Sequence, residues 1–463
     1  MSSPIIWIIY PVIFSLFLWI LRQYTVFVKI SAVVFCGSLL LTGLLLPINT
    51  FINIGTFSFE ISDELLILGR RLVLDNNDQQ AILFFYGLAT FWFAGTITIE
   101  INEHFVPIAL SIVALFISAI AVEPFLYASI LIEICVLMII PIILWDRKTV
   151  EQGVLLFLVF QTLAMPLILL AGWSSGGFEA NPTDQALLQQ TLVLLGLGFA
   201  IMLAIFPFHS WLPIFVRQNH PYITGFILTL QPILVLFLAL DFLNAFVWLR
   251  NFPQLFEGIR FIGLMIVVIS GFLAAFTQDM GRMFGYAVML ENGFAILALS
   301  LGNQIGLNIL VLSFIPRVVG LSVWALSLSV LKYMPETGFA PLIGSIRNHP
   351  IASFALILAG LSISGLPILP TYPIHLMVFE NIIRLSLNHA VLIFLGTVGF
   401  LVGILRMIRL LVVSNQKEWL FGENWSQIFF LTGGIGMMLI FGLFPKLYFP
   451  LLLPILNAFE YLP

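Results

Sequence analysis

Two apolar stretches of this chain are each interrupted by proline and carry a histidine, a residue type suited to proton transfer. Pro207 and His209 lie in the first stretch, and Pro367 and His375 lie in the second. A proline removes a backbone donor and clashes with the preceding helical turn, so each break at membrane depth leaves carbonyl groups that must face protein or water. Imidazole changes charge near neutral pH. Paired breaks of this kind point to an ion or solute pathway.

The two histidines have competing interpretations. His209 is as well suited to a proton relay as to a hydrogen bond that fixes the broken helix. His375 lies deeper in its apolar run, which favours the relay.

Other ionisable residues lie inside apolar segments, where a charge costs about 2.5–3.5 kcal/mol and marks a functional candidate by default. Glu133 has no charged neighbour in its own segment, so it is either a pathway carboxyl or a protonated group bonded to a backbone carbonyl. Arg317 cannot lose its proton and is either a structural counter-charge or a pathway element. Glu291 is a further pathway candidate, with a helix end or an interhelical hydrogen bond as the alternative.

The elements that position these residues must be membrane helices. Hydrophobic residues make up 61% of the 463 positions and charged residues only 9%, more apolar surface than a soluble fold can bury. A span needs about 20 mostly apolar residues, which predicts an all-α polytopic protein, a single membrane domain over 1–463 with about 14 transmembrane helices. The expected spans are 4–21, 26–46, 80–99, 105–122, 124–145, 152–172, 186–208, 222–240, 258–277, 283–301, 305–331, 351–378, 389–412 and 428–445.

Basic residues divide unequally between the two ends of these spans, which predicts the orientation. One side collects eleven: Arg22, Lys29, Arg147, Lys148, Arg217, Arg282, Lys332, Arg347, Arg406, Arg409 and Lys417. The other collects six: Arg70, Arg71, Arg250, Arg260, Arg384 and Lys446. The basic side is expected to be cytoplasmic, with both termini outside a bacterial plasma membrane or in the lumen of a thylakoid-type membrane.

Sequence motifs for self-contained catalysis are missing. The chain has no glycine-rich phosphate loop, no CxxC and no histidine pair at metal-ligand spacing, so we expect no cofactor, no metal and no catalytic site of its own. The net charge of −4 gives no reason to expect nucleic acid as a partner. Cys36 and Cys135 fall in expected spans and are interpreted as apolar fillers. Residues 47–79 form the longest piece outside the spans and predict a small hairpin or surface strand on the outer face.

Several motifs together resemble the antiporter-like membrane subunits shared by respiratory complex I (NADH:quinone oxidoreductase) and Mrp-type sodium/proton antiporters. They are the stretch from Gly196 to Pro213 followed by His220-Pro221, the turn Gln278-Asp279-Met280-Gly281-Arg282, the break Gly365-Leu366-Pro367, and Glu133 as the fifth-helix glutamate. The resemblance implies two inverted five-helix repeats, 104–241 and 258–412, each with one broken helix, flanked by helices in 1–99 and 428–445. It also implies a buried proton pathway, other membrane-arm subunits and the lipid bilayer as partners, and a redox arm elsewhere in the complex.

The chain departs from the family where lysines are expected. Met202 occupies the seventh-helix lysine position, Gln231 the eighth-helix position and Gly281 the turn position. The twelfth-helix position holds His375, and Arg317 stands for the eleventh-helix lysine. Because methionine carries no charge, Glu133 loses its expected partner, and a buried carboxyl without a cation tends to stay protonated.

Three functions remain open at the level of sequence. The first is a proton-translocating, non-redox subunit of a complex I-like or Mrp-like assembly that uses Glu133, His209, His375, Arg317, Gln231 and Glu291. The second is a degenerate subunit that keeps the fold and its lateral contacts without conducting. The third is the membrane partner of an inorganic-carbon uptake system.

Overall fold

The computed structural model confirms a mainly helical membrane protein. It describes residues 2–49, 51–54, 57–67, 69–144, 150–331, 342–413 and 419–462, with only the backbone described at 51–54 and 57–60. In this part of the chain, nine helices are long and apolar enough to cross a membrane, and three shorter apolar helices accompany them. The basic residues Arg147, Lys148, Lys332 and Lys417 lie outside the described residues.

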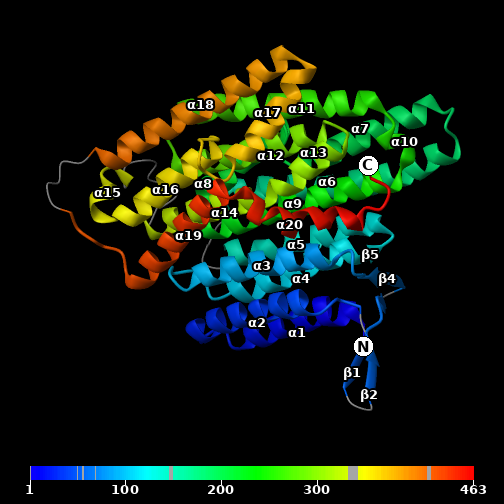
Figure 1. Cartoon of the computed structure of the whole chain (residues 1–463), viewed down its shortest axis with the longest axis horizontal. Helices are drawn as coiled ribbons and strands as arrows, with labels where there is room; N and C mark the ends of the chain where they lie inside the picture. Colours follow the sequence, from blue (N-terminus) through cyan, green and yellow to red (C-terminus); the bar gives the residue numbers. More distant parts are fainter. Residues whose placement is uncertain are drawn as a thin grey trace.

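Most helices lie close to the expected spans (Figure 1), but the helix expected over 152–172 continues to Ala180 and the span expected over 351–378 is divided and ends at Leu385. The first half of the chain forms α1 (Tyr10–Ile20), α2 (Thr25–Leu45), α3 (Gln79–Thr96), α4 (Phe105–Ala121), α5 (Ala128–Leu144), α6 (Gln152–Ala180), α7 (Gln185–Met202), α8 (Trp211–Gln218), α9 (Pro221–Ala245) and α10 (Val247–Arg250). The second half forms α11 (Pro253–Phe276), α12 (Met280–Leu299), α13 (Gln304–Leu312), α14 (Phe314–Val330), α15 (Ser345–Asn348), α16 (Pro350–Ile363), α17 (Tyr372–Leu385), α18 (Leu387–Val412), α19 (Trp425–Leu443) and α20 (Phe449–Leu452).

Prolines explain where an expected span is not one regular helix. In the first span a π-helical turn, Ile5–Ile9, precedes α1. Pro11 cannot donate to the carbonyl of Trp7, and the Tyr86 hydroxyl donates to that oxygen at 2.5 Å instead. The expected span 305–331 divides into α13 and α14 at Ser313, just before Pro316, which lies in the first turn of α14 where no helical donor is needed.

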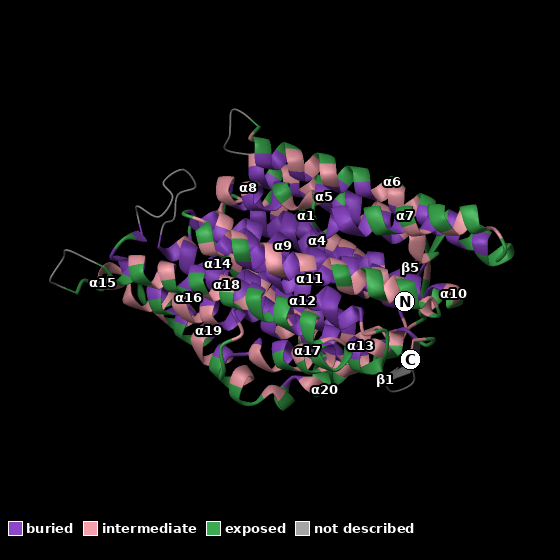
Figure 2. Ribbon diagram, turned by 90° about the horizontal axis from the view of Figure 1, so that it is seen from above, coloured by how far each residue is buried: buried purple, intermediate pink, exposed green. Residues whose placement is uncertain are grey.

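Burial separates central helices from peripheral ones (Figure 2). In the apolar windows of α9 and of α13–α14, 94% of residues are buried, against 33% in α2, α6, α7 and α18 and 17% in α19. Large side chains such as Phe261, Phe394 and Phe429 are exposed on the peripheral helices. A water-soluble protein would not expose so many, so these faces are suited to lipid or to other membrane helices.

Both broken spans have the same layout. Residues 203–210 separate α7 from α8, and residues 364–371 separate α16 from α17, so the two interruptions have equal length. The second residue of each interruption has a positive φ, 54° at Ala204 and 75° at Gly365. Pro207 and Pro367 each lie within one of these interruptions.

Small strands lie at one end of the bundle, and four of the five fall in the segment 47–79 predicted to form a hairpin or surface strand. Antiparallel β1 (Phe51–Ile54) pairs with β2 (Phe57–Glu60), and β3 (Glu64–Ile67), β4 (Arg70–Val73) and β5 (Val122–Glu123) form a second antiparallel sheet. Both chain termini lie toward this end, and α15 lies at the other (Figure 1). The termini share one end, as expected; the membrane side that this end faces stays a prediction.

Candidate functional site

Glu133 is buried in α5, and its partner comes from α6. The side chain is 7% exposed, and Thr162 Oγ1 donates a hydrogen bond to Glu133 Oε1 at 2.7 Å. A hydroxyl donor stabilises an ionised carboxylate without bringing a second charge. The structure therefore gives Glu133 a neutral partner in place of the lysine that the family pattern leads one to expect.

The neighbouring residue on α6, Gln161, joins α7 to α9. Its Oε1 accepts a hydrogen bond from Gln231 Nε2 at 2.8 Å, and its Nε2 donates to the carbonyl oxygen of Met202 at 3.4 Å. Met202 is the last residue of α7, so its carbonyl lies where the helix is interrupted. Two of the positions where the chain departs from the family pattern, Met202 and Gln231, are thus linked through one buried amide.

A proline inside α9 creates the contact for Arg317. Pro232 lacks an N–H, which leaves the carbonyl of Leu228, four residues earlier, without its helical donor. Arg317 Nη2 on α14 donates to this carbonyl oxygen at 3.2 Å. Arg317 is 1% exposed. It therefore provides a fixed positive charge inside the bundle, in contact with α9, the helix that also carries Gln231.

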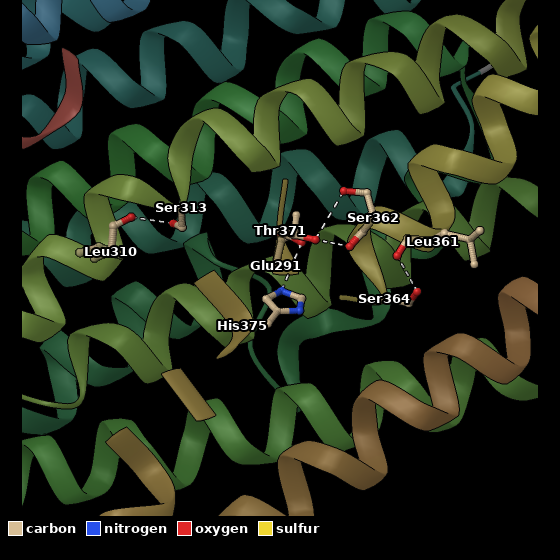
Figure 3. Close-up of polar contacts among 8 residues, drawn as sticks. All are labelled: Glu291, Leu310, Ser313, Leu361, Ser362, Ser364, Thr371 and His375. Carbon is tan, nitrogen blue, oxygen red and sulfur yellow. Dashed lines mark hydrogen bonds and ion pairs between the residues drawn. The ribbon is translucent and has the colours of Figure 1, made fainter. Parts of the chain in front are cut away.

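Glu291 lies in the middle of α12, where it faces the second broken helix (Figure 3). Its Oε1 is 3.7 Å from His375 Nε2, and its charge also interacts with that of Arg317. The His375 ring stacks on Phe294, with centroids 3.5 Å apart and planes 9° from parallel. The aromatic face fixes the ring orientation, so His375 presents a nitrogen to the Glu291 carboxylate.

The next residue of α12 holds the first broken helix. Asn292 Nδ2 donates to the carbonyl oxygen of Leu203 at 2.9 Å, directly after the end of α7. Adjacent residues of one central helix therefore contact both broken helices, Glu291 through His375 and Asn292 through Leu203.

Local contacts shape the second break. Thr371 Oγ1 donates to the carbonyl oxygen of Ser362, and Ser364 Oγ donates to that of Leu361 at 2.8 Å (Figure 3). Gly365 adopts a φ of 75°, and a Cβ at this position would lie 2.7 Å from His375 Nδ1. Glycine is therefore required twice over here, for its backbone conformation and for the space that the imidazole occupies.

His209 lies apart from these contacts. It is half-buried in a short 3-10 turn, Phe208–Ser210, beside the ring of Phe206. No contact in the described part of the chain joins it to Glu133 or His375, and its Nδ1 is buried without a hydrogen-bond partner there. Among the described residues the hydrogen-bond partner of Glu133 is therefore Thr162, and the role of His209 in a pathway stays a prediction.

Several polar atoms along the series have no hydrogen-bond partner within the described residues. They are Gln231 Oε1, Glu291 Oε1, Asn292 Oδ1, Arg317 Nε and Nη1, and both ring nitrogens of His375. A buried polar atom without a partner costs about 1–3 kcal/mol. Their gathering around α9, α12, α14 and α17 makes this region suited to bound water.

Sequence reasoning missed Gln161, Thr162 and Asn292. Each is a neutral side chain at a position that no motif of the family marks, unlike Gln231, which the family resemblance indicates. The sequence does mark the position of Thr162. Pro166 lies four residues later inside α6, so the carbonyl of Thr162 has no helical donor. Cys36 and Cys135 are buried in α2 and α5, as expected of apolar fillers. In the described residues, no cluster of histidine, cysteine and carboxylate side chains could hold a metal ion.

The family model for the transmembrane part of NADH:quinone oxidoreductase and Mrp antiporter subunits matches residues 134–401. The chain is 28% identical over 264 residues to NADH-quinone oxidoreductase subunit 14 of Thermus thermophilus, covering 56% of this chain and 58% of that protein. It is 26% identical over 226 residues to NADH-quinone oxidoreductase subunit N of Methylobacterium nodulans, covering 48% and 46%. The matches thus span about half the length of these curated relatives.

Solved structures share the fold over almost the whole chain. A chain of the archaeal membrane-bound sulfane sulfur reductase superposes with a TM-score of 0.81 at 16% identity, covering 100% of this chain and 99% of that one. A chain of the Mrp complex from Dietzia sp. gives 0.80 at 12% identity, with coverage of 99% and 97%. A chain of Thermus thermophilus respiratory complex I gives 0.72 at 19% identity, with coverage of 95% and 97%.

Proposed function

The chain belongs to the family of membrane subunits shared by NADH:quinone oxidoreductases and Mrp antiporters, and from this premise we propose that it translocates protons as a membrane-arm subunit of such an assembly. Its named relatives are subunits of multisubunit membrane complexes. The proposed partners are therefore other membrane-arm subunits and lipid, with any redox arm elsewhere in the complex. The proposed location is a bacterial plasma membrane or a thylakoid-type membrane, with both termini outside or lumenal.

One observation carries the proposal: two groups of buried polar contacts lie among the inner helices. In the first, Glu133 accepts a hydrogen bond from Thr162 on α6, and the adjacent Gln161 accepts one from Gln231 on α9. In the second, Arg317 contacts α9 and interacts with Glu291, which lies 3.7 Å from His375. Together these residues form the proposed polar series. Polar groups in a membrane interior are costly and persist where they serve a pathway.

The second half of the series brings three ionisable groups together. Arg317 carries a fixed positive charge that interacts with the Glu291 carboxyl, and this carboxyl lies 3.7 Å from the His375 imidazole. In the proposed pathway the proton passes through this group of side chains.

Water must complete the series between Gln231 and Arg317. Gln231 Oε1 and two guanidinium nitrogens of Arg317 have no partner among the described residues, and bridging waters would satisfy all three. A hydrogen-bonded chain of this kind is the physical requirement for proton transfer. The amides of Gln161 and Gln231 would orient these waters without titrating.

The proposed architecture has two inverted five-helix repeats, 104–241 and 258–412, flanked by helices in 1–99 and 428–445 and giving 14 membrane passes. The equal length of the two helix breaks supports it. The junction before α7 lies beside α10, because Phe178 packs on Trp248 with ring centroids 4.9 Å apart. By contrast, α16 begins at the end of the molecule that holds α15 (Figure 1). The two broken helices therefore enter the bundle from opposite ends.

A second candidate function is a scaffold subunit that keeps the fold without conducting. One observation favours it: Met202 stands at the position of the seventh-helix lysine, and Glu133 has a neutral partner instead. In that case the polar series would serve only to fix the packing of the central helices.

Proton translocation per catalytic turnover in the purified, reconstituted complex distinguishes the two functions. Glu133→Gln and His375→Ala should each lower this ratio while the complex retains its subunits. Glu257→Gln, on the exposed surface of α11, is the control for loss of a carboxylate and should leave the ratio unchanged. Unchanged ratios in both test variants would rule out translocation through this subunit and leave the scaffold function.

A further inference from the structure

The last carbonyls of α7 need hydrogen-bond donors from outside the helix. The helix ends at Met202, and the chain turns away at Ala204, which has a φ of 54°. The residue four positions after Leu203 is Pro207, which has no N–H, so the Leu203 carbonyl lacks a helical donor. Lipid tails carry no hydrogen-bonding groups. These carbonyls must therefore be satisfied from within the protein.

Two neutral amides from different helices fill this role. Asn292 on α12 donates to the Leu203 carbonyl oxygen at 2.9 Å. Gln161 on α6 donates to the Met202 carbonyl oxygen at 3.4 Å. Both amide side chains are almost fully buried, with 2% of Asn292 and 1% of Gln161 exposed. The end of α7 is thus held from two sides, through consecutive carbonyls, by bonds that bulk water does not reach.

Each amide lies next in the chain to a member of the polar series. Gln161 precedes Thr162, the hydrogen-bond donor to Glu133. Asn292 follows Glu291, the carboxyl that faces the second broken helix. Neighbouring residues of a helix keep a fixed relation, a rise of about 1.5 Å and a rotation of about 100°. A displacement of either amide therefore displaces the ionisable contact beside it.

We propose that Gln161 and Asn292 are positioning residues, which hold the end of α7 between them and so fix the relative position of the two groups of polar contacts. This role rests on the proposed function, because the relative position matters only where protons pass through both groups. Transfer between groups depends on geometry, and a misplacement of about 1 Å can slow a reaction by about 100-fold. Neutral amides are suited to this task because they bring no further charge to Glu133 or Glu291.

The helix α12 extends the effect of Asn292 to the second break. Phe294, two residues further along, stacks on the His375 ring, and Glu291 Oε1 lies 3.7 Å from Nε2 of that ring. One short stretch of α12 therefore contacts both broken helices. If Asn292 only satisfied a carbonyl, its loss would loosen the first break alone. If Asn292 positions α12 against α7, its loss also changes the second break.

Hydrogen exchange at the two breaks, measured by mass spectrometry on the purified complex, tests the proposal together with proton translocation. In Asn292→Leu, exchange over residues 203–210 should accelerate by about 5- to 150-fold, as expected for the loss of a hydrogen bond to a buried carbonyl. Exchange over residues 364–371 should accelerate by about 2- to 30-fold, the range of coupling through packed side chains. The number of protons translocated per turnover should fall while the complex retains its subunits and its turnover.

Gln161→Leu provides a second, independent variant and decides the question if the complex with Asn292→Leu does not assemble. It should also accelerate exchange over residues 203–210 and lower the number of protons translocated per turnover. Asn219→Leu is the matched control, because Asn219 is 1% exposed and its amide donates to the Phe215 carbonyl oxygen of α8 at 2.6 Å. It should leave exchange at both breaks and the proton ratio unchanged.

Two results would overturn the proposal. One is faster exchange in Asn292→Leu that is confined to residues 203–210, because the amide would then only satisfy a carbonyl. The other is an unchanged proton ratio in both amide variants. Glu291→Gln, measured in parallel, separates this failure from failure of the proposed function. A lowered ratio in Glu291→Gln with normal ratios in the amide variants refutes the positioning role alone, whereas a normal ratio in Glu291→Gln refutes translocation itself.

Discussion

Gly365→Ala tests whether the second helix break is shaped around His375. The new methyl group would lie 2.7 Å from His375 Nδ1, too close for any real contact, in a backbone with a φ of 75°. The ring has little freedom to move away because it stacks on Phe294. We therefore expect the substitution to strain the backbone and to displace the imidazole from Glu291.

The two effects have separate magnitudes. Left-handed backbone costs a residue with a Cβ about 1–2 kcal/mol, and overpacking a rigid site costs about 1–3 kcal/mol more. Gly365→Ala should therefore destabilise the protein by about 2–5 kcal/mol. Gly69→Ala is the control for backbone strain alone, because Gly69 has the same φ of 75° and a Cβ there meets nothing within 4 Å. It should cost no more than about 1–2 kcal/mol.

A double-mutant cycle isolates the contact with the ring. Unfolding in mixed micelles is followed for Gly365→Ala, His375→Ala and the double variant. Once His375 is alanine, the methyl group at 365 meets no ring, so its cost should fall by about 1–3 kcal/mol. Additive costs in the cycle would refute the reasoning, since they would mean that Gly365 and His375 do not restrict one another.

Three further substitutions probe other contacts. Asn292→Leu leaves the Leu203 carbonyl without its donor, so it should cost about 1–3 kcal/mol and speed hydrogen exchange over residues 203–210; unchanged exchange there would contradict the bridge. Thr162→Val removes the donor to Glu133 and should lower proton translocation per turnover, whereas Thr432→Val, on the exposed face of α19, should not. Burial raises the pKa of Asp78, which precedes α3, from 3.8 to about 7, against the hydrogen bond from the Asp75 amide. The folded state therefore binds the Asp78 proton more tightly than the unfolded state does. The stabilisation from this proton is complete below about pH 4 and is lost as the pH rises through about 7. The total change in the free energy of unfolding is at most about 4 kcal/mol. Asp78→Asn should flatten that dependence in unfolding titrations, and an unchanged pH profile would show that Asp78 ionises normally.

Much of the fold is predictable from the sequence because a membrane-spanning helix needs a long run of apolar residues. Apolar runs long enough to span, interrupted by prolines at Pro207 and Pro367, indicate the helices and both breaks. Irregular turns within a span are explained by individual prolines once the structure shows which group bonds to the freed carbonyl. Pro11 is an example, because the Tyr86 hydroxyl bonds to the carbonyl that it leaves free.

The candidate site is only partly predictable. Ionisable residues such as Glu291 and His375 are conspicuous in an apolar sequence, but nothing local shows that they meet across α12 and α17. Gln161 and Asn292 act through neutral amides on backbone carbonyls, and such contacts depend on helix packing alone. His209 has the residue type and the spacing of a relay group; it lies beside Phe206, and its part in the pathway stays a prediction.

The central claim is that buried charges around Glu291 move protons. The most direct measurement is the number of protons translocated per turnover by the reconstituted complex that carries Glu291→Gln, with subunit content and turnover measured in the same preparation. The substitution preserves size and removes the carboxylate that faces His375 and Arg317. We predict a lower ratio in an intact complex. A ratio equal to that of the unmodified complex would contradict the claim.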